Sequence, residues 1–143
     1  MDFGLRIDEA GVMNREELVA RTKQFALSVV ALVDDLPPGR AADVIGKQLL
    51  RSGTSVGANY RAACRARSRR EFIAKMGIVE EEGDESQFWL DLLIARGTVD
   101  KDRALALRHE AGQIVAITVA SIRTARRTPR SIPQSAIRNP QCL

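Results

Sequence analysis

The chain has 143 residues, of which 45% are hydrophobic, 28% are charged and 4% are aromatic, and its formal net charge at pH 7 is +4. This length suits one domain around one apolar core, and the proportions are those of an ordinary globular protein. No stretch approaches the ~20 apolar residues of a membrane-spanning helix, so no membrane span is predicted. The basic balance permits binding to nucleic acid or to an acidic surface without requiring either.

The two cysteines, Cys64 and Cys142, lie far apart and form no CxxC pair. We therefore expect unpaired thiols in a reducing compartment. The first ten residues, MDFGLRIDEA, are acidic and mixed in character, without the apolar run of a signal peptide. These features predict a cytoplasmic protein.

A first amphipathic helix is predicted over residues 14–36. Asn14, followed three residues later by Glu17, is a capping-box pattern at a helix start. Pro37 and Pro38 end the helix, because proline lacks the backbone donor and restricts the residue before it. Core-facing residues recur at intervals of three or four, the spacing of one helix face: Leu18, Thr22, Phe25, Val29, Leu32 and Leu36.

A second helix is predicted over residues 41–66, with small residues concentrated between Ser52 and Ala58. Each interior glycine costs about 1 kcal/mol relative to alanine, so we expect a neighbouring backbone to approach closely there. Asn59 is expected to fix the register of the helices, the alternative being a cap on a neighbour's backbone. For Tyr60, packing against another helix is favoured over stacking on a nucleic-acid base. The predicted buried face comprises Ile45, Leu49, Ser52, Val56, Asn59 and Ala63.

A third helix begins at a second capping box, Ser68 to Glu71, and ends near Gly97. A fourth begins near residues 100–102, where acidic residues suit a helix N-terminus. Prolines from Pro129 onward forbid its continuation. The third helix is predicted to bury Phe72, Met76, Val79, Gly83, Ser86, Leu90 and Leu93. The fourth is predicted to bury Leu107, Ala111, Ile114, Thr118, Ser121 or Ile122, and Ala125.

Four long helices with short connections predict an all-α fold: a left-handed, antiparallel up-down-up-down four-helix bundle. We expect an N-terminal extension over residues 1–13, the bundle over 14–128, and a disordered or irregular tail over 129–143 that contains proline and arginine. Apolar residues outside the predicted buried faces indicate more apolar surface than one bundle hides, and hence self-association. They are Val30, Val33, Leu50, Ile73, Ile94, Val115 and Val119.

Charge is distributed unevenly along the chain. Residues 49–70 and 101–143 each sum to +6, whereas residues 71–100 sum to −6 and residues 1–48 to −2. In the predicted topology the second and fourth helices run in the same direction, so their basic C-terminal ends meet at one end of the bundle. We predict that the arginines there bind nucleic acid: Arg61, Arg65, Arg67, Arg69, Arg70, Arg123, Arg126 and Arg127.

Two alternatives to nucleic-acid binding stay open for these arginines. Arginines at helix C-termini complement the helix dipole by about 0.3–1 kcal/mol each, and Glu16, Glu17 and Glu71 are predicted nearby as ion-pair partners. A protein partner with an acidic face would also fit. With Arg130 included, nine arginines stand against three acids at this end. This excess favours a polyanionic ligand, because phosphate binding releases counterions and the guanidinium fork matches the geometry of phosphate.

The remaining polar residues suggest neither a metal site nor catalysis. The acidic run over residues 80–85 lacks the Glu-x-x-His pairs of di-metal bundles, and we expect Arg51 to pair with Glu82 instead. His109 is the only histidine, and Cys64 lies within a predicted helix without a base to complete a catalytic group. We therefore predict that the protein is not an enzyme and uses no cofactor and no metal.

Two segments carry a resemblance to a known family: LLRSGTSVGANYRAACRARS at residues 49–68 and FIAKMGIVEEEGDESQFWLDLL at residues 72–93. They resemble the four helix bundle protein family, also called the 23S ribosomal RNA intervening-sequence protein family, and the resemblance covers nearly all of residues 18–126. Some members are encoded within insertions in large-subunit ribosomal RNA genes. The family is also similar to the accessory variability protein of retroelements, a basic pentamer that binds a reverse transcriptase and nucleic acid.

The resemblance implies a four-helix fold, no enzymatic activity and assembly into a homopentamer. Five basic ends on one face of such a ring would form a basic annulus. The implied function is that of a non-enzymatic accessory factor that associates with RNA or DNA. The alternative is a scaffold that binds an acidic protein partner.

Overall fold

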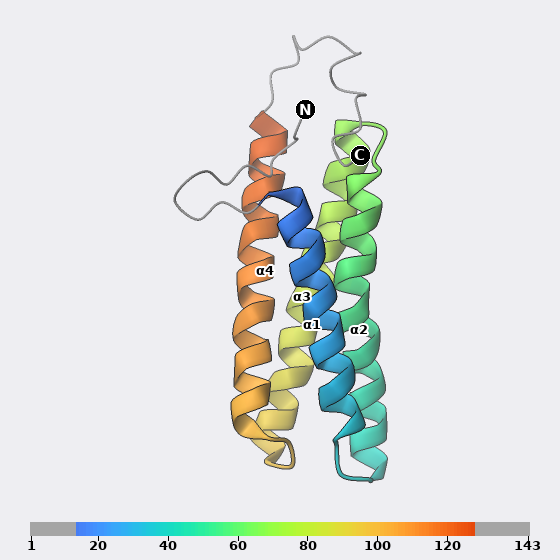
Figure 1. Cartoon of the computed structure of the whole chain (residues 1–143), viewed down its shortest axis with the longest axis vertical. Coiled ribbons are helices and arrows are strands. Elements are labelled where there is room, and N and C mark those ends of the chain that lie inside the picture. Colours follow the sequence, from blue (N-terminus) through green and yellow to red (C-terminus); the bar gives the residue numbers. More distant parts are fainter. Residues whose placement is uncertain (1–13, 128–143) are drawn as a thin grey trace.

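The computed structural model describes residues 14–127, which form four α-helices joined by short connections. They are α1 (Arg15–Asp34), α2 (Arg40–Cys64), α3 (Arg69–Arg96) and α4 (Lys101–Arg127). Each helix runs antiparallel to the one before it (Figure 1). The predicted all-α, up-down-up-down bundle is confirmed, and no strand occurs among residues 14–127. The predicted extension over 1–13 and tail over 129–143 lie outside the described residues.

Local sequence signals set the helix ends as predicted. Asn14 Oδ1 accepts a hydrogen bond from the Glu17 backbone N–H at 2.9 Å at the start of α1. At the start of α3, Ser68 Oγ accepts from the Glu71 N–H at 3.1 Å. These bonds satisfy amide groups that have no partner inside the helix. Gly97 ends α3 with φ of 81°, a left-handed conformation that glycine adopts without a Cβ clash.

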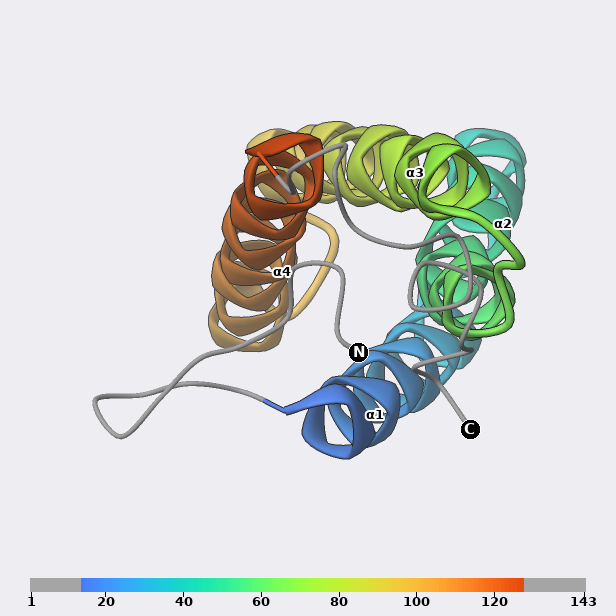
Figure 2. The same ribbon diagram turned by 90° about the horizontal axis from the view of Figure 1, so that it is seen from above.

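The helices pack in the order α1, α2, α3, α4 around the bundle, and α1 contacts α4 less than any other neighbouring pair (Figure 2). Two ion pairs of the described chain bridge this weak side: Arg103 of α4 pairs with Asp35, which directly follows α1, at 2.8 Å, and Arg21 of α1 pairs with Glu110 of α4. Arg21 Nε lies 2.6 Å from Glu110 Oε2, and Arg21 Nη2 donates to Glu110 Oε1 at 2.7 Å. The hydrogen bonds to Glu110 raise the pKa of the Arg21 guanidinium. This bidentate contact holds the first helix against the last.

The buried residues confirm the predicted faces of α1 from Leu18 to Leu32, of α3 and of α4. In α2 the buried surface is shifted: Gly46 and Tyr60 are buried, whereas the adjacent Ile45 and Asn59 are only half-buried. The physical reason is that α2 packs between α1 and α3 and buries two of its sides. A single row of residues spaced by three or four positions therefore does not cover the buried surface of α2.

The register role predicted for Asn59 is wrong. Asn59 Nδ2 donates to the Ser55 carbonyl oxygen of its own helix at 2.9 Å. The polar contact between helices comes instead from two fully buried serines, since Ser86 Oγ of α3 donates to Ser52 Oγ of α2 at 3.0 Å. This bond fixes the relative height of α2 and α3 at a buried site, where a hydroxyl left without a partner would be costly.

The sequence predicted that a neighbouring backbone approaches the small residues of α2. Such an approach occurs at Gly57, where an added Cβ would lie 3.4 Å from the Thr22 carbonyl oxygen, whereas at Gly53 the close neighbour is the Val29 side chain of α1. A Cβ added at Gly53 would lie 2.9 Å from Val29 Cγ2, shorter than any ordinary contact between carbon atoms. Glycine at this position therefore lets α1 and α2 come together, at a cost in helix propensity.

Two alanine substitutions should separate these effects. Gly53→Ala is expected to lower the free energy of unfolding by about 1–3 kcal/mol, because the new methyl group overpacks Val29. Gly77→Ala is the matched control: no atom lies within 4 Å of its added Cβ, so the substitution should raise stability by up to about 1 kcal/mol. Urea unfolding measures both. Equal changes of the same sign would contradict the close approach at Gly53.

Exposed apolar residues are present, but mostly not those predicted. Val30 is exposed, whereas the other six predicted positions are only half-buried because they flank the core and are partly covered by neighbouring helices. The most exposed large apolar side chains include Val44, Leu27 and Phe88, at 58%, 54% and 54% exposure. None of the four helices has a stretch apolar enough to cross a membrane within the described chain.

Candidate nucleic-acid interface

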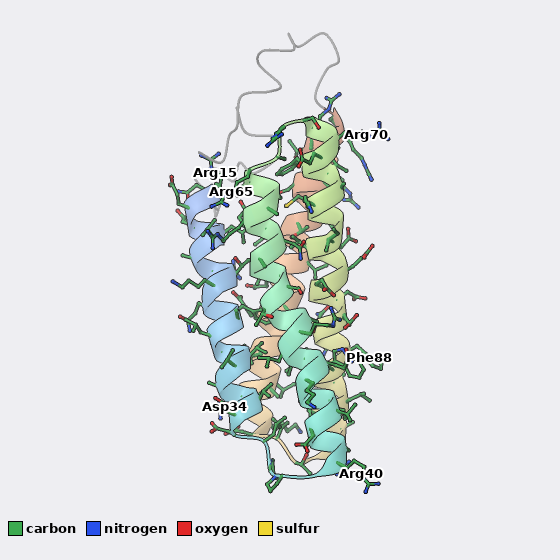
Figure 3. All side chains as sticks on the ribbon, turned by 90° about the vertical axis from the view of Figure 1, so that its right-hand side faces the viewer. Arg15, Asp34, Arg40, Arg65, Arg70 and Phe88 are labelled. Atoms are coloured by element: carbon green, nitrogen blue, oxygen red, sulfur yellow. The ribbon has the colours of Figure 1, made fainter. Side chains whose placement is uncertain are left out.

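The eight predicted arginines lie at one end of the bundle. The C-terminal ends of α2 and α4 are at this end, together with the starts of α1 and α3 (Figure 1). In Figure 3, Arg65 and Arg70 lie here near Arg15, whereas Asp34 and Arg40 lie at the opposite end. We call this surface the basic end, defined by Arg61, Arg65, Arg67, Arg69, Arg70, Arg123, Arg126 and Arg127. The chain thus brings two separate basic segments to the same place.

Most of these arginines are exposed and not neutralised. Arg69 is half-buried, and the other seven are exposed. Within residues 14–127, those seven have no ion-pair partner: the ion pairs of the bundle use Arg21, Arg51, Arg103 and Arg108. The seven guanidinium groups are therefore available to an external anion.

Two of the three acids predicted at the basic end, Glu17 and Glu71, take part in helix capping. Glu17 Oε1 accepts from Asn14 Nδ2 at 2.9 Å, and Glu71 Oε2 accepts from the Arg67 backbone N–H at 2.9 Å. Both carboxylates thus interact with the groups that begin α1 and α3. The sequence placed these acids correctly at the basic end. The two carboxylates keep their negative charge, but they are outnumbered by the seven exposed arginines and form no ion pair with them in the described chain.

Helix dipoles do not account for the surplus of positive charge. The C-termini of α2 and α4 each carry about half a negative charge, and the N-termini of α1 and α3 each carry about half a positive charge. Because all four termini meet at the basic end, these partial charges nearly cancel. Arg61 and Arg126 lie in the last turns of their helices and gain from the local dipole, but the end as a whole has no net dipole charge for seven arginines to neutralise.

The acidic run of α3 is partly neutralised in the middle of the bundle, as predicted. Arg51 Nη1 of α2 lies 2.8 Å from Glu82 Oε2, and Arg51 Nη2 also pairs with Glu85. The hydrogen bond to Glu82 raises the pKa of the Arg51 guanidinium. Trp89 Nε1 donates to Glu85 Oε2 at 3.1 Å and holds that carboxylate in place. Arg51 is thus occupied within the bundle and is not part of the basic end.

Three further candidate residues do not join the basic end as ligands. Tyr60 is buried to 1% exposure, so packing is confirmed and its ring cannot stack on a base. Cys64 is buried, and His109 is exposed on α4, where its Nε2 lies 3.0 Å from Gln113 Nε2. Among residues 14–127, no group of three His, Cys, Asp or Glu side chains could hold a metal ion.

Sequence reasoning missed an open groove between α1 and α2, just below the basic end. It is lined by Val19, Lys23, Ala26, Gly57, Ala58 and Arg61, among others, and has a volume of about 520 Å³. The groove exists because alanines and a glycine face one another across two helices. The small residues of α2 were visible in the sequence, but the matching Ala26 becomes informative only once the pairing of α1 with α2 is known.

Comparison with known proteins identifies the family. The family model described as 23S rRNA-intervening sequence protein matches residues 15–120, which include α1 to α3 and most of α4. The chain belongs to the 23S rRNA-intervening sequence protein family. Arg61 to Arg70 lie within the matched family region, whereas Arg123, Arg126 and Arg127 lie beyond it. No curated protein sequence matches the chain.

A solved structure supports the fold. The chain is similar to a protein of unknown function from the S23 ribosomal protein family of Bacteroides thetaiotaomicron VPI-5482, with 32% sequence identity and a TM-score of 0.72. The match covers 78% of this chain and 99% of that one. The relative thus shares the helical fold over almost its whole length.

Proposed function

We propose that this protein is a non-enzymatic accessory factor that binds RNA or DNA through the basic end. The observation that supports this proposal is the set of seven exposed arginines without ion-pair partners in the described chain, which two distant segments bring to one end. A dense group of unpaired guanidinium groups is suited to phosphates, which accept two parallel hydrogen bonds from each fork.

The chemistry of the basic end favours contact with the nucleic-acid backbone over reading of bases. Among residues 14–127, Tyr60 is buried, and the exposed aromatic side chain, Phe88, lies in the C-terminal half of α3, away from the basic end (Figure 3). Phosphate contacts position a protein on nucleic acid but carry no sequence information. We therefore expect binding with little sequence preference and a strong dependence on salt.

A salt titration tests the proposal. Fluorescence anisotropy with a labelled single-stranded RNA and with a DNA duplex of equal length should show affinity that falls by about 10³-fold between 50 and 200 mM salt, as expected for roughly six phosphate contacts. The proposal would be overturned if no binding is detected, or if the affinity does not change with salt concentration. If the basic end instead binds an acidic protein, capture of that protein by this chain should survive nuclease treatment.

A further inference from the structure

Six exposed arginines of the basic end form two separate groups. The α2–α3 group lies where the chain passes from α2 into α3 and consists of Arg65, Arg67 and Arg70. The α4 group lies in the last turns of α4 and consists of Arg123, Arg126 and Arg127. None of the six has an ion-pair partner in the described chain. The basic end therefore carries these cations as two sets of three.

Backbone hydrogen bonds hold the α2–α3 group in place. The Arg65 N–H donates to the Ala62 carbonyl oxygen at 3.1 Å, and the Arg67 N–H donates to Glu71 Oε2 at 2.9 Å. The next residue, Ser68, caps α3 through its bond with the Glu71 N–H. The short connection between the two helices is therefore fixed at both ends, and its arginines extend from an ordered backbone.

The α4 group lies on the outer side of α4. Arg126 and Arg127 follow Arg123 by three and four positions, a spacing that places all three residues on one helix face. Ile122 and Ala125 are 6% and 0% exposed, so the buried face of α4 points the other way. Because packing on the buried face holds this helix, the three arginines also extend from a fixed position.

Packed helices keep the two groups apart. In the order α1, α2, α3, α4 around the bundle, α2 and α4 occupy opposite corners, with α3 between them (Figure 2). Neighbouring packed helices have axes about 8–10 Å apart, so the axes of α2 and α4 are separated by roughly 11–14 Å. Because α2 and α4 each pack against α3, the two arginine groups stay at separate corners and do not gather around one phosphate.

A double helix presents phosphates at a matching, fixed separation. Its two strands face each other across grooves, and the major groove of B-form DNA is about 12 Å wide. Double-stranded RNA is likewise contacted through its backbone across its grooves, by shape and largely without reading of bases. A single strand has no such fixed spacing. A protein that holds a single strand at two distant points must order the strand between them, which lowers the affinity.

The described part of the basic end offers no platform for stacking of bases. Sites for single-stranded nucleic acid combine cations with aromatic rings on which successive bases stack. Among residues 14–127, Phe25, Tyr60 and Phe72 are buried. Phe88 and Trp89 pack against each other with ring centroids 4.9 Å apart, in the half of α3 away from the basic end (Figure 3). The aromatic residues of the described chain thus give the basic end no advantage for single strands.

We propose that the basic end binds double-stranded nucleic acid in preference to single strands. The α2–α3 group contacts phosphates of one strand, and the α4 group contacts phosphates of the other strand across one groove. This inference rests on the proposed function and adds the form of nucleic acid that the basic end takes. Because both groups contact phosphates, RNA and DNA duplexes are both ligands, and strand pairing matters more than base sequence.

A competition experiment with the full chain tests the preference. A labelled RNA duplex is displaced, at one salt concentration, by the unlabelled duplex, by a DNA duplex of the same length, or by each separate strand of unstructured sequence. The duplexes should compete at least about tenfold better than the single strands, because their phosphates are already spaced for both arginine groups. Single strands that compete as well as the duplexes would refute this inference and leave the proposed function standing. Absence of binding to every probe would refute both.

Removal of one arginine group at a time tests the contact with two strands. The variant without the α4 group should lose at least about ten times more affinity for the duplex than for the single strand, because only one strand of the duplex stays held. The variant without the α2–α3 group should behave in the same way, so that both variants lose the preference. The substitutions are Arg123→Ala, Arg126→Ala and Arg127→Ala in the first variant, and Arg65→Ala, Arg67→Ala and Arg70→Ala in the second.

A third variant supplies the matched control. Arg40→Ala, Arg96→Ala and Lys101→Ala together remove the same charge from the opposite end of the bundle, where all three side chains are exposed. This variant should keep the full preference for duplexes. All replaced side chains are exposed, so circular dichroism should show wild-type helix content in the three variants. A preference that persists in either arginine-group variant, or that disappears in the control, would contradict the contact with two strands.

Discussion

Removing three arginines from the basic end is expected to weaken RNA binding by about 10²-fold at low salt. Arg65 directly follows α2, Arg70 lies at the start of α3 and Arg126 lies at the end of α4, and all three are exposed. If each contacts one phosphate, the triple alanine variant should lose about one unit of the log–log salt slope for each arginine. Anisotropy titrations at several salt concentrations measure both the affinity and the slope.

The opposite end supplies a control with the same loss of charge. Arg40, Arg96 and Lys101 are exposed at the start of α2, the end of α3 and the start of α4, and none has an ion-pair partner in the described chain. Their triple alanine variant also lowers the net charge by three, yet it should change RNA affinity by less than about threefold. Equal losses in both variants would show that net charge, and not the basic end, controls binding.

The fold accounts for the availability of the arginines at this end. Four helix termini of alternating sign meet there, so their dipoles nearly cancel. The nearby Glu17 and Glu71 interact with capping groups. Because the arginines at this end outnumber its acids, the end keeps a positive potential, and the arginines repel one another unless an anion binds. Binding of a polyanion therefore relieves repulsion as well as forming new contacts.

The sequence predicted the fold well where one face of a helix is buried. In α1 and α3, buried residues recur strictly at three or four positions, and Asn14 and Ser68 mark the starts through side chains that bond the backbone. Both signals are local, so they act through residues within one or two turns and do not depend on the rest of the chain. The meeting of two arginine segments then followed from helix count and short connections alone.

Prediction failed where the outcome depends on which helices are neighbours. In α2, Ile45 is only half-buried and Gly46 is buried instead, because α2 packs against two partners, which the spacing of its apolar residues does not reveal. Asn59 bonds its own helix instead of a neighbour. The pair Arg21–Glu110 joins residues 89 positions apart and requires the arrangement of α1 beside α4. The groove between α1 and α2 likewise exists only after the helices are placed in three dimensions.

Substitution of Tyr60 is expected to have the second large effect, a loss of folding stability. Its side chain is among the largest in the core and is 1% exposed, close to the basic end of α2. Tyr60→Ala should lower the free energy of unfolding by about 3–5 kcal/mol, because it removes the buried ring and leaves a cavity. This is a large share of the roughly 5–15 kcal/mol that stabilises a typical domain, so urea unfolding should show a much earlier midpoint.

Tyr60→Leu separates this packing role from a role in binding. Leucine fills part of the space and should cost less stability than alanine, while it removes any aromatic stacking. Under conditions in which the variant is fully folded, its affinity for single-stranded RNA should equal that of the wild type, since a buried ring contacts no base. Stacking on a base is worth about 1–3 kcal/mol, so a loss of affinity of that size in folded Tyr60→Leu would mean that α2 opens to expose residue 60 when RNA binds.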